Sequence, residues 1–337
     1  MRYQKLSLEQ IKVVTNATAV FESYRGLTEK ENRYKGSMHW KRIGGRDYLY
    51  RGFSYGRVKS LGRRSPKTED LKRQFDEGRT TYLTEKKSLR DALLLHAGYI
   101  RLNRLNRFPL AGARVIRAFE QQGIPIRIIG THALYAYEMG AGVLFLPEYL
   151  ATEDIDILMD DRQAMKIVSS LNKRTLLSIL RASDPSFNKV TSSDYEFAAR
   201  NASGYRVELI TQGRSDPSVS SRFLELLENT DIKPSEIDIL KWHVSSPPYR
   251  EVVFDQRGMP VWVPTVDPRS FVIHKWYVSH QDTRKPIKQK RDLAQAEAVA
   301  DVIENEFSHL PKSPAIRRLF PQSVVESVPF DTDKFSI

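Results

Sequence analysis

EDIDILMD, at residues 153–160, alternates carboxylates with apolar side chains. Alternate side chains of a β-strand share a face, so Asp154 and Asp156 point one way while the neighbouring isoleucines point into a core. Two adjacent carboxylates repel each other unless a cation lies between them. Mg²⁺ suits such a pair because it binds carboxylate oxygens and completes its shell with phosphates and water. The pattern predicts a strand that carries a metal site, and a solvated strand end is the alternative.

A second acid-bearing strand is expected further along the chain. Glu208 lies in YRVELI, residues 205–210, with apolar neighbours on both sides. If this strand pairs beside the first, three carboxylates meet at one edge of the sheet. Three acids suffice to hold two divalent cations about 3.5–4 Å apart for in-line phosphoryl transfer. An exposed glutamate on a hairpin face is the alternative, and Asp160 or Asp161 is then the next candidate for the third acid.

A glycine turn precedes these strands. IIGTHA, residues 128–133, leaves an apolar strand and enters a helix. Gly130 lets the backbone approach a ligand, and the N-terminus of the helix offers free N–H groups to phosphate oxygens. Thr131 adds a hydroxyl donor. No GxxxxGK[ST] sequence is present, so a P-loop is not supported.

This order of features resembles the polymerase-β-like nucleotidyltransferase superfamily. Longer phrases are similar to one bacterial family of nucleotidyltransferase-fold proteins whose substrate is poorly defined. The similarity runs from about residue 10 to 305. The phrases are GSMHWKRIGGRDYLYR (36–51), KSLGRRSPKTE (59–69), IIGTHALYAYEMGAGV (128–143), LATEDIDILMD (150–160), SDPSF (183–187), GYRVELI (204–210) and VDPRSFVIHKWYVSHQDTRKPIKQKRDLAQAEAV (266–299).

The resemblance implies a role for each residue of the core. Gly130 and Thr131 would hold the triphosphate of an NTP such as ATP. Asp154 and Asp156 would ligate two Mg²⁺ ions, with Mn²⁺ as a substitute. Glu208 would be the third carboxylate, which helps to bind the first metal and accepts the proton of the attacking hydroxyl.

The resemblance also places C-terminal helices beside the nucleotide. Lys275, Lys288 or Arg291 would then neutralise triphosphate charge. A solvated helix face is the alternative for each, and Asp292 is equally suited to orient one of these bases through an ion pair. None of the seven histidines has metal-ligand spacing, and each is expected to be structural. His132 and His274 are the two nearest the proposed site.

The positive charge of the chain is concentrated in one segment, the basic window at residues 33–67. The formal net charge of the chain is +12, and this window holds eleven Lys and Arg against one acid, a local +10. Six aromatics are interleaved with them: Tyr34, Trp40, Tyr48, Tyr50, Phe53 and Tyr55. Rings that stack on bases and cations that pair with phosphates are what RNA or DNA binding needs. We expect nucleic-acid contacts from Trp40, Lys41, Arg42, Arg46, Arg51, Lys59, Arg63 and Arg64, and aromatics that pack a small sheet under solvated cations are the alternative.

Composition excludes several classes of protein. The absence of cysteine rules out disulfides, thiolate metal sites and a cysteine nucleophile. The longest stretch without charged residues, 128–137, is about half of what a membrane helix needs. The N-terminus has no continuous apolar segment of the kind found in secretory signals. We therefore expect a cytoplasmic protein with no membrane partner.

The fold class expected is α+β, in three parts. These are an N-terminal basic aromatic module with helices (1–108), a nucleotidyltransferase core with a mixed sheet flanked by helices (109–214) and a mostly helical C-terminal domain (215–337). Spacing predicts helices at 7–24, 68–105 and 109–123, one or two hairpins within 34–55, and further hairpins at 195–211 and 249–263. Ser7 and Gln10 are placed to form a capping box at the first helix.

The function expected is Mg²⁺-dependent transfer of a nucleoside monophosphate from an NTP to an acceptor hydroxyl. The favoured acceptor is a nucleic-acid 3′ end such as that of tRNA, as in toxin-type members of the superfamily, with a cognate antitoxin or operon partner. A protein side chain or a small molecule is the alternative acceptor. A non-catalytic nucleic-acid-binding protein of the same fold is the third possibility.

Overall fold

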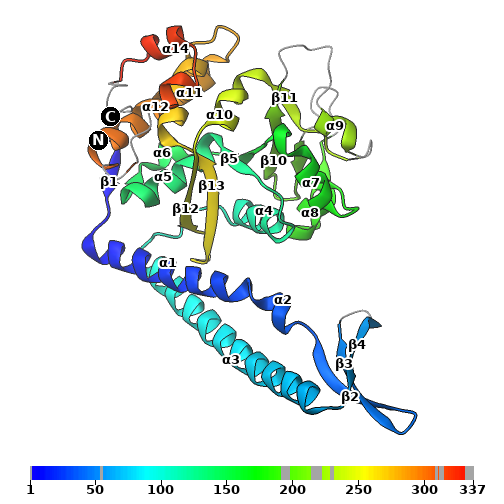
Figure 1. The fold of residues 1–337 in the computed structure, drawn as a ribbon. Coiled ribbons are helices and arrows are strands. Elements are labelled where there is room, and N and C mark those ends of the chain that lie inside the picture. The colour runs from blue at the N-terminus through cyan, green and yellow to red at the C-terminus, as the bar shows by residue number, and fades with distance from the viewer. Residues whose placement is uncertain are drawn as a thin grey trace. The chain divides into compact units, whose positions relative to one another are not determined.

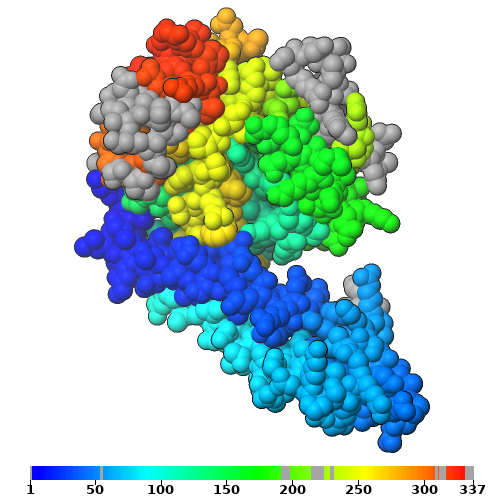
Figure 2. All heavy atoms as spheres, viewed as in Figure 1, coloured from blue at the N-terminus to red at the C-terminus, as the bar shows by residue number. Residues whose placement is uncertain are grey.

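The computed structural model describes residues 2–53, 56–190, 198–213, 222–227, 231–307, 310 and 315–330. The chain divides into two compact units, one made of Met1–Ile11 with Arg104–Ile337 and the other of Lys12–Asn103 (Figures 1 and 2). Segment 215–337, which we expected to form a part of its own, lies in the same unit as the expected core. Tyr55 of the basic window and residues 195–197 of an expected hairpin lie outside the described residues.

The large unit is built on a mixed sheet. Its strands run in the order β12 (Pro248–Phe254), β13 (Pro260–Val266), β5 (Arg127–Ile129), β7 (Asp154–Met159), β10 (Arg206–Gln212), β9 (Ala198–Arg200) and β8 (Asn188–Lys189), and β11 (Ser235–Ile237) also pairs with β10. Pairing is parallel between β13 and β5 and between β7 and β10, and antiparallel between β5 and β7. This mixed sheet with its helices agrees with the α+β class expected. The hairpin predicted at 249–263 forms as β12 and β13, and it extends the core sheet beside β5.

Helices pack around the sheet and each other in the large unit. Among the described residues, α4 packs on α8, α5 on β12 and β13, and α11 on α12. A short separate pair joins β1 (Tyr3–Lys5) to β6 (Val143–Phe145). The helices are α4 (Leu110–Gln121), α5 (Ala133–Ala141), α6 (Pro147–Leu150), α7 (Ala164–Leu171), α8 (Leu176–Ser183), α9 (Arg222–Leu226), α10 (Lys241–Ser245), α11 (Pro268–Ser279), α12 (Pro286–Asn305), α13 (Ala315–Arg318) and α14 (Gln322–Ser327), with 3₁₀ turns at Gly130–His132, Asp161–Gln163 and Asp238–Leu240.

The small unit combines two long helices with a three-stranded antiparallel sheet. Its elements are α1 (Leu8–Thr28, which begins in the large unit), α2 (Glu31–Tyr34), β2 (Ser37–Ile43), β3 (Arg46–Gly52), β4 (Val58–Arg63) and α3 (Pro66–Leu102). The predicted capping box is confirmed, because the Ser7 and Gln10 side chains each accept a hydrogen bond from the other's backbone N–H, at 3.2 and 3.0 Å. The turn between β2 and β3 is made by Gly44 and Gly45, both at positive φ, as a tight two-residue hairpin requires. No helix in the described parts of the chain is long and apolar enough to cross a membrane.

Candidate active site

The two predicted acidic strands are neighbours in the sheet. β7 and β10 pair in parallel, with Asp156 opposite Glu208 and Asp154 opposite Arg206. The alternation also holds, since Ile155 and the other apolar residues between the acids are fully buried while the three acids are only partly buried. The pairing that would bring three carboxylates to one edge is therefore confirmed.

A cavity of about 230 Å³ lies over these acids. All seven residues expected at the core site line it: Gly130, Thr131, Asp154, Asp156, Glu208, Lys275 and Lys288. Carboxylates come from the sheet, and cations come from α11 and α12. The remaining wall includes apolar side chains, among them Ile237, Leu240 and Phe271. Acidic, cationic and apolar residues around one cavity suit a metal-bound nucleotide with its base.

Gly130 lies against the carboxylate of Asp156. Its φ is +66°, and a Cβ built on it would come within 2.4 Å of Asp156 Oδ2. Thr131 next to it is nearly buried, and its hydroxyl accepts a hydrogen bond from Gln295 Nε2 at 3.1 Å. The same Nε2 donates to the carbonyl of Tyr149 at 2.8 Å. Gln295 of α12 thus binds the residue after the turn glycine, a contact that the sequence analysis did not predict.

Two of the three acids, Asp156 and Glu208, have raised pKa values. Burial, with the nearby carboxylates of Glu208 and Asp154, raises the pKa of Asp156 from 3.8 to about 7. Burial also raises the pKa of Glu208, although Arg206, whose guanidinium lies 3.0 Å from the Glu208 carboxylate, opposes the shift. Thr152 donates its hydroxyl hydrogen bond to Asp154. Ionising these neighbouring carboxylates together therefore costs free energy unless a cation joins them.

The donor chemistry of this cluster fits a hard divalent cation. Carboxylate oxygens are the ligands that Mg²⁺ prefers, and a cation would relieve the repulsion that raises the pKa of Asp156. Within the described residues, no three acidic or histidine side chains are already arranged as a metal centre. Glu208 instead lies against Arg206, so this carboxylate would have to exchange a cationic partner for a metal.

The cationic side is organised by a buried aspartate. Asp292, with no exposed surface, binds Lys275 Nζ at 2.5 Å and the Arg284 guanidinium at 2.6 Å. Burial lowers the pKa of Lys275, and Asp292 opposes that shift. Lys288 is exposed with no ion pair in the described part of the chain, and the buried Arg291 Nε has no hydrogen-bond partner there. The ion-pair role expected as one option for Asp292 is present, and two further cations remain available.

Two histidines in ring contact form part of the cavity wall. The rings of His243 and His274 have centroids 4.1 Å apart, and both line the cavity. Burial lowers the pKa of His274 to about 3, and burial together with the nearby His274 lowers the pKa of His243 well below its usual value, so both rings are neutral. His274 was expected near the site, whereas no spacing or motif marks His243. His132 is also buried, and its Nε2 lies 2.9 Å from the Tyr205 hydroxyl.

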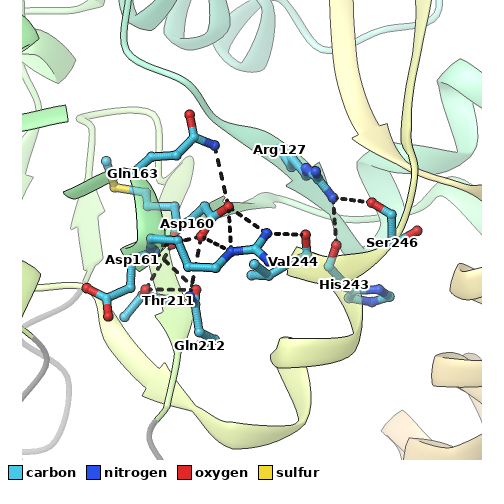
Figure 3. A network of polar contacts seen from close by, with 11 residues as sticks. Arg127, Asp160, Asp161, Gln163, Thr211, Gln212, His243, Val244 and Ser246 are labelled. Carbon is cyan, nitrogen blue, oxygen red and sulfur yellow. Dashed lines mark hydrogen bonds and ion pairs between the residues drawn. The ribbon is translucent and has the colours of Figure 1, made fainter. Parts of the chain in front are cut away.

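Asp160, the fallback candidate for a third acid, belongs to another network (Figure 3). It forms an ion pair with Arg162 at 2.9 Å and does not line the site cavity. Arg162 also donates to the Val244 carbonyl at 2.8 Å. Arg127 donates to the carbonyls of His243 and Ser246 at 2.7 and 2.9 Å. The network ties the end of the sheet to α10 and thereby fixes the backbone that carries His243.

Residues of the basic window lie on both faces of the small sheet. Strand register places Trp40, Arg42, Arg51 and Lys59 on the face of the buried Leu49. The same register places Lys41, Arg46 and Arg63 on the opposite face.

Two of the window's cations are engaged inside the small unit. Arg51 donates to the carbonyls of Arg33 and Lys35 at 2.7 and 3.1 Å. Arg64 forms ion pairs with Asp47 and Glu69 and lies over the ring of Trp40, 5.1 Å from its centroid. These partners show that part of the local positive charge is compensated on the side of Leu49.

The sequence of the large unit is similar to that of a known protein family. A family model described as "Nucleotidyltransferase" matches residues 111–320, more than half of the sequence. No curated protein and no solved structure matches. The matched segment contains every residue that lines the cavity. The protein is therefore a transferase enzyme, and it belongs to this nucleotidyltransferase family.

Proposed function

We propose that this protein transfers a nucleoside monophosphate from an NTP to an acceptor hydroxyl in a Mg²⁺-dependent reaction. The observation that supports this most directly is one cavity lined by three carboxylates, by cations of α11 and α12 and by the turn at Gly130. Phosphoryl transfer needs little covalent chemistry from a protein, and positioning with charge neutralisation accounts for most of its catalysis. The residues of this cavity supply both.

Asp154, Asp156 and Glu208 would hold Mg²⁺, as one or two ions, or Mn²⁺ in its place. When bound, the metal polarises phosphoryl oxygens and neutralises developing charge. The Gly130 backbone and the Thr131 hydroxyl bind triphosphate oxygens. Thr131 is buried and bound by Gln295 of α12, which fixes its hydroxyl for this contact.

Lys275, Lys288 and Arg291 neutralise the triphosphate from the opposite side. The acceptor oxygen attacks the α-phosphorus of the NTP. The bond between that phosphorus and the oxygen bridging to the β-phosphate breaks, and pyrophosphate leaves. The proton of the acceptor hydroxyl passes to Glu208. Burial raises the pKa of Glu208, which makes this carboxylate a stronger base than a solvated one.

The favoured acceptor is the 3′ end of a nucleic acid, RNA in particular and tRNA as the first case to test. The local charge of +10 over residues 33–67, interleaved with aromatic rings, supports this choice over a small molecule. A toxin-type activity with a cognate antitoxin follows from the same sequence resemblance.

Labelling identifies both substrates in one experiment. The protein is incubated with each α-labelled NTP, Mg²⁺ and total RNA, and the labelled molecule is then isolated. We expect RNA to carry the label with one preferred NTP. Label on a protein or on a small molecule would show that this molecule, and not RNA, is the acceptor. No labelled product with any NTP would refute the activity.

Matched carboxylate variants test the site itself. Glu208→Gln keeps the size of the side chain but loses its charge, so turnover should fall by roughly two or more orders of magnitude while NTP affinity changes much less. Asp154→Ala should abolish transfer. Asp161→Asn is the control, since Asp161 does not line the cavity. Normal turnover in the Asp154 variant would end the assignment.

A further inference from the structure

The three-stranded sheet of the small unit has two unlike faces. On the helix-facing side, Leu49 is fully buried and the Arg51 guanidinium lies between rings, 5.0 Å from the Phe75 centroid of α3. The cations Arg51 and Arg64 on this side have carbonyl, carboxylate and ring partners within the unit. The packed part of this side therefore compensates Arg51 and Arg64 internally, whereas Arg42 and Lys59 on the same side are exposed.

The other side, called here the outer face, is open and carries no acid. Register places aromatic and cationic residues on it, together with Ser37 and Ser60: His39, Lys41, Arg46, Tyr48, Tyr50 and Arg63. The three cations and His39 are exposed, and the two tyrosines are partly exposed. Ile43 and Val58, at 44% and 62% exposure, add apolar surface to the same side.

The rings of the outer face are arranged as a platform. His39 and Tyr50 pair across β2 and β3, with ring centroids 6.4 Å apart and planes 23° apart. Lys41 Nζ lies 5.9 Å from the centroid of Tyr50. Tyr48 is two residues from Tyr50 on the same strand, roughly 7 Å along it, so each ring can meet a different base of an extended strand. Arg46 and Arg63 have no ion-pair partner within the described residues.

We propose that the outer face binds single-stranded RNA, with bases against His39, Tyr48 and Tyr50 and phosphates against Lys41, Arg46 and Arg63. The biological role of this RNA binding rests on the proposed function, because the outer face would hold the RNA acceptor. Bases of a duplex are stacked on each other and cannot reach rings on a sheet, whereas unpaired bases can. His39 and Ser60, both on this face, offer hydrogen bonds to a ribose 2′-hydroxyl, which favours RNA over DNA.

Binding is measured on the full chain without NTP, by the anisotropy of a labelled, unstructured RNA oligomer at several salt concentrations. Three phosphate contacts on a single strand predict a log–log salt slope of about −2. Duplex RNA and the matching DNA oligomer should bind more weakly. The proposal is overturned if RNA does not bind at low salt, or if either competitor binds as tightly.

Two charge-matched double variants separate the faces. Lys41→Ala with Arg46→Ala removes two cations of the outer face and should flatten the salt slope by about 1 to 1.5 units. Arg42→Ala with Lys59→Ala removes the same charge from the helix-facing side and should leave the slope unchanged. An equal loss in both variants would mean that net charge alone drives binding, which contradicts the proposal.

Tyr48 tests the stacking. Tyr48→Ala should weaken RNA binding by roughly 5- to 150-fold with an unchanged salt slope, the usual effect of losing one base–ring stack. Tyr48→Phe keeps the ring and should bind like the wild type, which separates stacking from damage to the sheet. Unchanged affinity in Tyr48→Ala would exclude the platform. RNA binding without any nucleotide transfer would refute the proposed function and leave this surface assignment intact.

Discussion

At Gly130 the backbone comes so near the Asp156 carboxylate that no side chain fits between them. A Cβ there would lie 2.4 Å from Asp156 Oδ2, and the φ of +66° is one that L-residues adopt only at a cost. Gly142, at the other end of α5, has nearly the same φ of +67° but no atom within 4 Å of its would-be Cβ. Substituting alanine at Gly142 therefore tests backbone strain alone, whereas alanine at Gly130 adds a steric clash with the Asp156 carboxylate.

Gly130→Ala should abolish most transfer and lower stability more than Gly142→Ala does. Gly142→Ala should cost about 1 kcal/mol from backbone conformation alone and leave turnover unchanged. Denaturant unfolding and labelled-NTP turnover measure the two effects. Equal activity in the two variants would show that the position of Asp156 beside the turn does not matter for catalysis.

The raised pKa of Asp156 makes stability depend on pH in a stated direction. With a folded-state pKa of about 7 against 3.8 for the free residue, the folded protein keeps a proton that the unfolded chain loses between these values. Stability contributed by this residue is therefore complete below about pH 4 and decreases until about pH 7. Asp156→Asn should raise the melting temperature of the metal-free protein at pH 8, and the gain should vanish near pH 4.

Asp282→Asn is the control for that pH series, because it removes an exposed carboxylate outside the cavity. Its melting temperature should follow that of the wild type at every pH. If Asp156→Asn shows no gain at pH 8, burial and repulsion do not act on this carboxylate as its surroundings indicate.

At the scale of elements, one stripe of α12 both reaches the cavity and supports the residues around it. Lys288, Asp292 and Gln295 recur at the i, i+4, i+7 spacing that places side chains on one helical face. Lys288 faces the cavity, Asp292 holds two cations, and Gln295 binds Thr131. This stripe was available as a signal in the sequence, although only its charged members were singled out.

Lys288→Ala should weaken NTP binding by roughly 3- to 10-fold, the loss expected of one partly solvated charge interaction. Its melting temperature should stay that of the wild type, because Lys288 is exposed and forms no ion pair within the described residues. Lys290→Ala, on the same helix but outside the cavity, is the control and should change neither property. Calorimetric titration with a non-hydrolysable NTP measures the affinities, and equal values for both variants would remove Lys288 from the site.

At the scale of the whole molecule, the chain forms two units that we expect to unfold separately. Leu49 is fully buried in the small unit, and Leu→Ala in such a position costs about 2–5 kcal/mol. In a unit of this size that lowers the melting temperature by roughly 10 °C or more. Scanning calorimetry of Leu49→Ala should show one transition shifted and the other unchanged, with NTP binding retained. A single transition that shifts as a whole would show that the two units unfold together.

The local part of this architecture follows from the sequence alone. Alternation of acids and apolar residues at 153–160 and 205–210 determines which side chains share a face, because a strand repeats every two residues. The capping box at Ser7 and the turn at Gly130 are equally local, since a few neighbouring backbone groups define them. The concentration of charge in residues 33–67 is a property of the sequence and needs no fold at all.

The tertiary structure determined which strands and helices these local elements pack against. Sequence predicted an acidic strand at Glu208, but only long-range packing set it parallel to β7 with Glu208 opposite Asp156. Packing also placed α11 and α12 over the acids, added β12 and β13 to the core sheet, and divided the basic window between two faces of a small sheet. These outcomes depend on burying apolar surface from distant segments at once. No short window of sequence determines how strands and helices from distant segments pack. Hydrogen bonds between near neighbours, by contrast, depend on only a few adjacent residues.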